Sequence, residues 1–103
     1  MQDITVQELK KRLDAGDKNF VFLDVREPYE YEEFNLNAQL IPLGTVMTAA
    51  MTELADNKDD EIIIHCRSGK RSGDAQRILI AMGFTNVRNV EGGVLAWKHA
   101  FGA

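Results

Sequence analysis

Short apolar runs alternate with amphipathic stretches along this chain. Residues 20–25 and 61–65 are dominated by valine, leucine, isoleucine and phenylalanine, without the regular polar alternation of a half-exposed strand. Such runs are typical of strands that are buried on both faces, as in a parallel sheet. Two shorter runs, residues 39–41 and 87–90, are predicted to be further strands.

Local capping signals predict where the first helices begin. Thr5 and Glu8 have the spacing of a capping box, so a helix is expected to start at Val6 and to end near Gly16. Pro28 can open a short second helix as its first residue, because a proline at that position loses no intrahelical hydrogen bond. Gly83 is expected to end the fourth helix, and Gly92 and Gly93 are expected to precede the last helix.

Apolar residues predict three more helices. One stripe at helical spacing, which we assign to the core, is Val46, Met47, Ala50, Met51 and Leu54. A second helix has Ala75, Ile78, Leu79 and Met82 on one face, and the last helix carries Leu95, Ala96, Trp97 and Phe101. Strands and helices that alternate in this way predict a single α/β domain over residues 1–103, with a parallel sheet covered by helices on both faces and right-handed crossovers.

Composition and charge narrow the class of function. The formal charge of −4 has the wrong sign for a protein that binds nucleic acid over its whole surface. No apolar stretch is long enough to cross a membrane, and the first residues lack the pattern of a secretory signal, so a soluble, cytoplasmic protein is expected. The only cysteine is Cys66 and the only histidines are His65 and His99, which leaves no internal disulfide and no Cys/His zinc site. We predict neither a metal nor a cofactor.

The loop that follows the second buried run carries the candidate chemistry. It begins at Cys66 and continues through Arg67, Ser68, Gly69, Lys70, Arg71 and Ser72, which places three cations around the only thiol of an acidic chain. The loop leads into a predicted helix N-terminus, whose unpaired amides favour an anion. The helix dipole, these amides and the three cations all favour the thiolate, so Cys66 is a candidate nucleophile for an anionic substrate.

Other candidate groups are weaker. His65 precedes Cys66 on a strand and should point to the opposite face, so it is not expected to form a cysteine–histidine pair. His99 lies on the last predicted helix without an evident partner. The carboxylates of Glu30, Glu32 and Glu33 are assigned to a solvated helix face.

The order and spacing of several short motifs make the chain resemble the single-domain rhodaneses, the thiosulfate sulfurtransferase family. The motifs are Asp24-Val25-Arg26-Glu27 with Glu30-Tyr31, Ile41-Pro42-Leu43, the segment 62–72, Gly83-Phe84 with Val87, and Gly92-Gly93 with Ala96-Trp97. The resemblance implies a five-stranded parallel sheet flanked by helices. It also implies a persulfide on Cys66, held by the amides of residues 66–72. Asp24 and Arg26 match positions that support the loop and the sheet, and Trp97 matches a core anchor.

The resemblance further implies a small anionic sulfur donor such as thiosulfate and an external acceptor, which is a thiol, cyanide or a protein. The chain departs from the family pattern at residues 34–38, where a Gly-His-Ile segment is usual. A phosphatase or arsenate reductase of the same fold is an alternative, but those enzymes have five residues between cysteine and arginine, whereas Cys66 and Arg71 have four between them. A non-catalytic interaction module and a sulfur carrier that feeds a partner also remain open.

Overall fold

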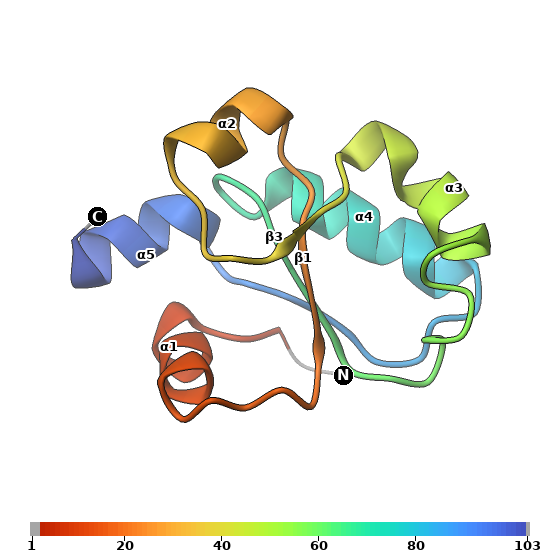
Figure 1. The fold of residues 1–103 in the computed structure, drawn as a ribbon, viewed down its shortest axis with the longest axis horizontal. Helices are drawn as coiled ribbons and strands as arrows, with labels where there is room; N and C mark the ends of the chain where they lie inside the picture. The colour runs from red at the N-terminus through yellow and green to blue at the C-terminus, as the bar shows by residue number, and fades with distance from the viewer. Residues whose placement is uncertain (1–2, 103) are drawn as a thin grey trace.

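The computed structural model describes residues 3–102, in which helices and parallel strands alternate (Figure 1). The strands are β1 (Val21–Asp24), β2 (Gln39–Leu40), β3 (Ile62–His65) and β4 (Val87–Asn89). The helices are α1 (Val6–Asp14), α2 (Pro28–Glu33), the 3-10 turn η1 (Leu43–Thr45), α3 (Val46–Met51), α4 (Lys70–Ala81) and α5 (Gly93–Phe101). The α/β class is confirmed, although the ends of the predicted domain, Met1, Gln2 and Ala103, lie outside the described residues. No helix within residues 3–102 is long and apolar enough to span a bilayer.

The sheet within residues 3–102 has four strands in the order β2-β1-β3-β4, all parallel, so the expectation of five strands is wrong. At the place of a fifth strand, beside β4, Ile4 forms a single parallel bridge with Val90. The chain cannot extend this pairing forward because Thr5 is already the N-cap of α1. On the other side of Ile4, the Asp3 side chain accepts the backbone N–H of Asn89 at 3.0 Å.

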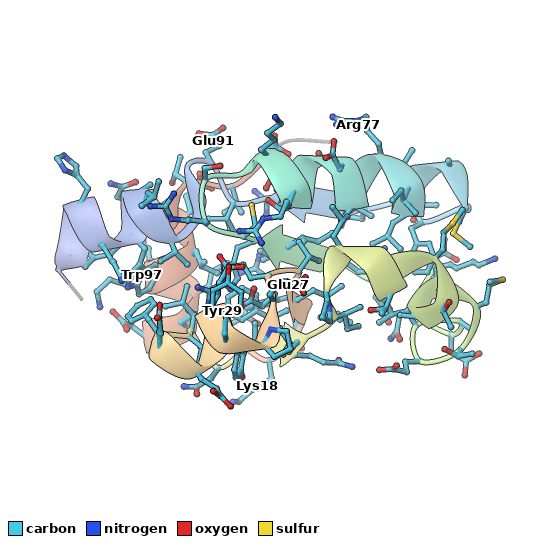
Figure 2. All side chains as sticks on the ribbon, turned by 90° about the horizontal axis from the view of Figure 1, so that it is seen from above. Lys18, Glu27, Tyr29, Arg77, Glu91 and Trp97 are labelled. Atoms are coloured by element: carbon cyan, nitrogen blue, oxygen red, sulfur yellow. The ribbon has the colours of Figure 1, made fainter. Side chains whose placement is uncertain are left out.

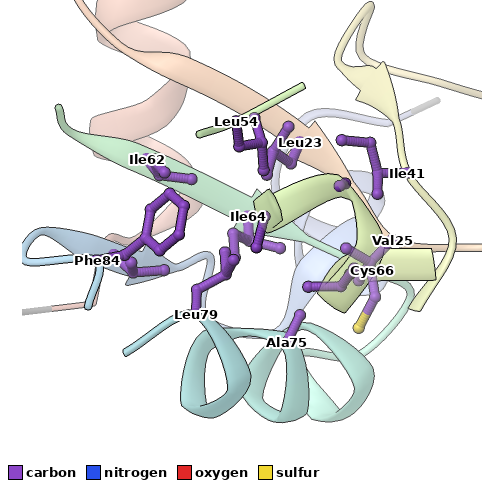
Figure 3. Close-up of a cluster of buried hydrophobic side chains, with 14 residues drawn as sticks. Leu23, Val25, Ile41, Leu54, Ile62, Ile64, Cys66, Ala75, Leu79 and Phe84 are labelled. Atoms are coloured by element: carbon purple, nitrogen blue, oxygen red, sulfur yellow. The ribbon is translucent and has the colours of Figure 1, made fainter. Parts of the chain in front are cut away.

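Alternate residues of β3 face two hydrophobic clusters on opposite sides of the sheet. Ile62 and Ile64 pack against α3 and α4, in the cluster drawn in Figure 3. Ile63 packs against α1 and α5. Seen from above, α5 extends toward one end of the molecule, α3 and α4 extend toward the other, and α2 lies between them (Figure 2). The sheet is therefore covered on both faces, with α2 near the carboxyl ends of β1 and β3, where a ligand of a parallel sheet is expected.

The predicted start of the first helix is confirmed, because Thr5 and Glu8 form a complete capping box. The assignment of Met47 and Met51 to the core is wrong, since these side chains are 59% and 65% exposed. The helix α3 has only six residues, and its buried side is occupied by Val46, Ala49 and Ala50. Met47 and Met51 are four residues apart, which places both on the opposite, outer side of α3.

Candidate active site

Cys66 lies directly after β3, where the chain leaves the carboxyl end of the sheet. The residue is only 1% exposed and packs in the same cluster as Val25. Its Sγ accepts a hydrogen bond from the Gly69 backbone N–H at 3.1 Å and one from the Ser72 hydroxyl at 3.3 Å. The sulfur therefore faces the inside of its own loop, and only a slender group can reach it.

The predicted loop is shorter than expected because Lys70, Arg71 and Ser72 already form the first turn of α4. Gly69 is the N-cap of this helix and has a φ of 98°, a left-handed conformation that glycine adopts without strain. This turn directs the first amides of α4 toward Cys66. The helix N-terminus expected from the sequence is thus present, and the thiol is among its hydrogen-bond acceptors.

Two opposing effects set the pKa of the Cys66 thiol. Burial raises the pKa, whereas the Ser72 hydroxyl and the backbone N–H groups of Ser72, Gly69 and Ser68 lower it. The hydrogen bonds outweigh burial, so the pKa of Cys66 lies below its usual value. The thiolate fraction at neutral pH is therefore larger than that of an ordinary buried cysteine.

Asn89, at the end of β4, orients the Ser72 hydroxyl from the other side. The Asn89 Nδ2 donates to the Gly69 carbonyl at 2.9 Å, which leaves Oδ1 to accept from the Ser72 hydroxyl at 2.6 Å. A hydroxyl has one proton, so Ser72 donates either to Asn89 or to the Cys66 sulfur at any moment. We infer that the Ser72 proton turns from Asn89 toward the sulfur when the thiol ionises. Asn89 was not among the residues predicted from the sequence, although a polar side chain at the carboxyl end of a strand is a usable signal.

We expect Ser72→Ala to raise the pKa of Cys66, because the substitution removes the hydroxyl that contributes most to lowering it. The rate of Cys66 alkylation by iodoacetamide, measured against pH, should therefore rise at a higher pH than in the native protein, with slower alkylation at pH 7. Ser68→Ala is the matched control, because Ser68 acts through its backbone N–H, which alanine keeps. Equal pH profiles for the native and Ser72→Ala proteins would contradict this role of Ser72.

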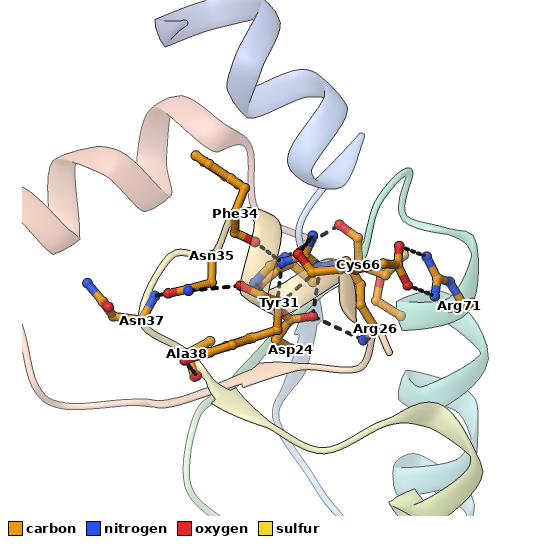
Figure 4. A network of polar contacts seen from close by, with 12 residues as sticks. Asp24, Arg26, Tyr31, Phe34, Asn35, Asn37, Ala38, Cys66 and Arg71 are labelled. Atoms are coloured by element: carbon orange, nitrogen blue, oxygen red, sulfur yellow. Dashed lines mark hydrogen bonds and ion pairs between the residues drawn. The ribbon is translucent and has the colours of Figure 1, made fainter. Parts of the chain in front are cut away.

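The sequence predicted that Arg71 is one of three cations available around the thiol. In the structure Arg71 instead forms a two-point ion pair with Glu30 of α2. Its Nη1 and Nη2 lie 2.7 and 2.9 Å from the two Glu30 carboxylate oxygens (Figure 4). The hydrogen bonds from Arg71 lower the pKa of Glu30 to about 2. The assignment of Glu30 to a solvated helix face is thus wrong, since its side chain is 11% exposed. This ion pair joins the first turn of α4, next to the Cys66 loop, to α2.

The other two loop cations, Arg67 and Lys70, are exposed, and neither forms an ion pair within residues 3–102. Their charges are therefore available to an incoming anion, whereas that of Arg71 is offset by Glu30.

Asp24 and Arg26 form a buried ion pair that fastens α2 to the end of β1. Arg26 Nη2 lies 2.8 Å from Asp24 Oδ2 and donates to the Phe34 carbonyl at 2.7 Å, just after the end of α2 (Figure 4). A cation at a helix C-terminus satisfies carbonyls that have no partner within the helix. The hydrogen bonds of this pair thus hold α2, and its link to the Cys66 loop passes through Glu30 and Arg71.

Neither histidine is placed to act as a base on Cys66. His65 is fully buried, and its Nδ1 lies 3.4 Å from the Cys66 carbonyl oxygen rather than from the sulfur. Burial lowers the pKa of His65, which favours the neutral ring at pH 7. His99 is on α5, and none of its polar contacts in the described structure involves Cys66.

The start of α5 supports the loop from behind. Val94 N–H donates to the Cys66 carbonyl at 3.0 Å and Leu95 N–H donates to the Arg67 carbonyl at 2.9 Å. These bonds require the backbone of Gly93 to lie close to the backbone of Cys66 and Arg67. Gly93 has a φ of 54°, and a Cβ at this position would lie 2.5 Å from the Cys66 carbonyl oxygen. Gly92 and Gly93 were predicted to precede the last helix and matched a motif of the family, but no contact with the Cys66 loop was expected of them. The pattern of the local sequence does not show that α5 packs against the loop.

Taken together, these contacts describe a lone thiol with a lowered pKa, which accepts hydrogen bonds from amides and from the Ser72 hydroxyl and is bordered by two cations, Arg67 and Lys70, that have no ion-pair partner in the described part of the chain. No second cysteine exists to resolve a covalent adduct internally. The arrangement can accept a group from a small anion by nucleophilic attack and release it to an external acceptor.

Comparison with known proteins agrees with this geometry. Residues 5–100 match the family described as rhodanese-like domain. The chain is 36% identical to the thiosulfate sulfurtransferase PspE of Escherichia coli over 69% of its own length and 68% of that protein. It is also 35% identical to a tRNA uridine(34) hydroxylase of Photorhabdus laumondii, over 91% of its own length but only 27% of that protein.

A solved structure of a rhodanese-like domain protein from Staphylococcus aureus superposes with a TM-score of 0.77. It is 36% identical, and the match covers 94% of this chain and 91% of that one. Relatives of this domain thus include both short proteins and much longer ones.

Proposed function

This chain belongs to the rhodanese-like domain family, and from that premise we propose that it is a sulfurtransferase that transfers sulfane sulfur through a persulfide on Cys66. The donor is a small anion such as thiosulfate, and the acceptor is an external thiol, cyanide or a protein. The observation that carries the proposal is the hydrogen bonding of the Cys66 sulfur by Gly69 and Ser72 at the N-terminus of α4. The same donors can hold the anionic outer sulfur of a persulfide.

The reaction proceeds in two displacements. The Cys66 thiolate attacks the outer sulfur of thiosulfate, the bond between the two sulfur atoms breaks, and sulfite leaves with the electron pair of that bond. A nucleophilic acceptor then attacks the outer sulfur of the persulfide, and Cys66 departs as the thiolate. No external oxidant or reductant is needed, and Cys66 is regenerated.

The unpaired charges near the loop support an anionic donor. Arg67 and Lys70 are exposed at the loop of a chain whose overall charge is −4, so they provide local attraction against a repulsive background. This attraction is screened by salt, with a Debye length of about 8 Å at physiological ionic strength. We therefore assign Arg67 and Lys70 to donor capture and Arg71 to loop structure.

A phosphatase or arsenate reductase activity is the less favoured alternative. The four-residue spacing between Cys66 and Arg71 leaves a tight loop, and the Arg71 guanidinium is already occupied by Glu30. A tetrahedral oxyanion would have to compete with this carboxylate for the arginine. This occupied arginine argues for sulfur transfer rather than for phosphoryl or arsenate chemistry.

Intact mass measurement tests the proposed function. Incubation with thiosulfate in the absence of acceptor should increase the mass of the protein by one sulfur atom, and cyanide should reverse the increase. A gain of oxygen atoms would indicate oxidation of the thiol instead, which cyanide does not reverse. The absence of any gain would favour a non-catalytic interaction module and contradict the proposal.

A further inference from the structure

A cavity opens beside the Cys66 loop, between α2 and α5. Its volume is about 240 Å³, and its walls include Glu33 and Phe34, Arg67, and Val94, Leu95 and Lys98. This volume is below that of sites for drug-sized ligands, which start at roughly 300 Å³, so it suits a small molecule. The walls of the cavity combine charged side chains with the hydrocarbon surface of Phe34, Val94 and Leu95.

This cavity is directly connected to the catalytic loop. Arg67 follows Cys66 in the chain, and consecutive Cα atoms are about 3.8 Å apart. The backbone of Val94 and Leu95 is hydrogen bonded to the carbonyls of Cys66 and Arg67. The cavity therefore borders the backbone of the loop that begins at Cys66.

The unpaired charges of the cavity favour an anionic group. Arg26 and Glu30, which also contribute to its walls, are engaged with Asp24 and Arg71. By contrast, Arg67 and Lys98 form no ion pair within residues 3–102, and Lys98 Nζ lies 4.7 Å from the centre of the Phe34 ring. Glu33 is the one carboxylate of the wall that has no cationic partner within this part of the chain. Two free cations thus face one free carboxylate.

We propose that this cavity binds the sulfur acceptor, and that the acceptor is a small thiol that carries a carboxylate group. The carboxylate lies between Lys98 and Arg67, the hydrocarbon part contacts Phe34 and Leu95, and the thiol extends toward Cys66. This inference rests on the proposed function, because it names the acceptor for the same persulfide.

The donor does not account for this cavity. Thiosulfate has no hydrocarbon part to contact Phe34, Val94 or Leu95, and the amides around Cys66 already provide donors for its outer sulfur. A carboxylate at one end and a thiol at the other match both the charged and the apolar walls. The acceptor thiolate attacks the outer sulfur of the persulfide, the bond from that sulfur to Cys66 breaks, and a hydropersulfide of the acceptor leaves.

Single-turnover kinetics of the persulfide-loaded protein test this assignment. The protein is loaded with thiosulfate and freed of donor, and the loss of the sulfur atom is followed by intact mass with 3-mercaptopropionate, 2-mercaptoethanol or cysteamine. We expect Lys98→Gln to raise the half-saturating concentration of 3-mercaptopropionate roughly fivefold relative to that of 2-mercaptoethanol. This factor corresponds to the loss of one partly exposed ion pair, which is worth about 1 kcal/mol. Each thiol is compared between proteins, so its intrinsic reactivity cancels.

Lys11→Gln is the matched control, because Lys11 is an exposed lysine on α1 and the substitution changes the net charge by the same amount. It should leave the ratio between the two thiols unchanged. An equal effect of Lys98→Gln on all three thiols, or no effect, would overturn the proposal. A matching slowing of the loading step with thiosulfate would instead assign the cavity to the donor.

A binding measurement separates this proposal from the sulfur-transfer proposal. The probe is 3-(methylthio)propionate, which has the carboxylate but no free thiol, and the readout is the amide NMR shifts of the unloaded protein. We expect concentration-dependent shifts at Arg67, Leu95 and Lys98, which Lys98→Gln weakens and Lys11→Gln does not. Shifts without persulfide formation would support the carboxylate site and reject the sulfur transfer, whereas the absence of these shifts would reject the site.

Discussion

Cys66→Ser is expected to abolish the transfer of sulfur from thiosulfate to cyanide, with a loss on the order of a thousandfold or more in kcat/KM. A serine hydroxyl is almost completely protonated near neutral pH and is a far poorer nucleophile than a thiolate. The amides that lower the pKa of Cys66 do not change this, because their effect is small compared with the difference between an alcohol and a thiol. The measurement is steady-state production of thiocyanate.

The substitution is close to isosteric, so the loss should not come from unfolding. The serine oxygen can still accept hydrogen bonds from the Gly69 N–H and the Ser72 hydroxyl, which now contact Sγ. Circular dichroism should therefore show an unchanged fold and a thermal midpoint near that of the native protein. Comparable activities of the native and Cys66→Ser proteins would remove Cys66 from the mechanism.

Gly93→Ala is expected to destabilise the protein strongly and to disorganise the loop that begins at Cys66. A Cβ at this position would lie 2.5 Å from the Cys66 carbonyl oxygen and 2.7 Å from that of Arg67, and φ is +54°. The left-handed conformation costs a non-glycine residue about 1–2 kcal/mol, and the overlap adds about 1–3 kcal/mol. The two backbone carbonyls cannot move away without breaking their hydrogen bonds to Val94 and Leu95.

For a domain of this size, a loss of about 3 kcal/mol lowers the thermal midpoint by more than about 10 °C. Gly16→Ala is the matched control, because Gly16 also has a positive φ, +72°, but a Cβ there would meet no atom within 4 Å. It should show only the smaller cost of the backbone conformation. Equal losses in the two variants, measured by thermal unfolding, would mean that the contact with the Cys66 loop is unimportant.

Local sequence patterns predicted most elements of the fold. The capping box formed by Thr5 and Glu8 and the apolar runs before Asp24 and Cys66 are signals that extend over a few residues, and the corresponding elements are present. The fifth strand was expected because of the family resemblance. Within residues 3–102, its place is taken by the single bridge between Ile4 and Val90, next to which the Asp3 side chain accepts the N–H of Asn89. No local pattern signals that contact.

The exposure of residues was predicted less well than their secondary structure. Met47 and Met51 fit a helical apolar stripe together with Val46 and Ala50, but only the latter pair is buried. A stripe predicts that one face of a helix is apolar, whereas its width and the neighbouring helix decide which members of the stripe are covered. Glu30 was misassigned for the same reason, since its burial depends on the approach of Arg71 from α4.

Three features could be predicted from the sequence because each depends on neighbouring residues along the chain: the α/β class, the place of Cys66 after a buried strand, and the helix N-terminus that follows it. The distant groups that meet the loop are seen only in the folded protein. Arg71 and Glu30 are 41 residues apart and Ser72 and Asn89 are 17 apart. Such pairs depend on strand order and on the packing of helices over the sheet. These determine whether a cation at the loop remains free for a substrate or is bound by a carboxylate.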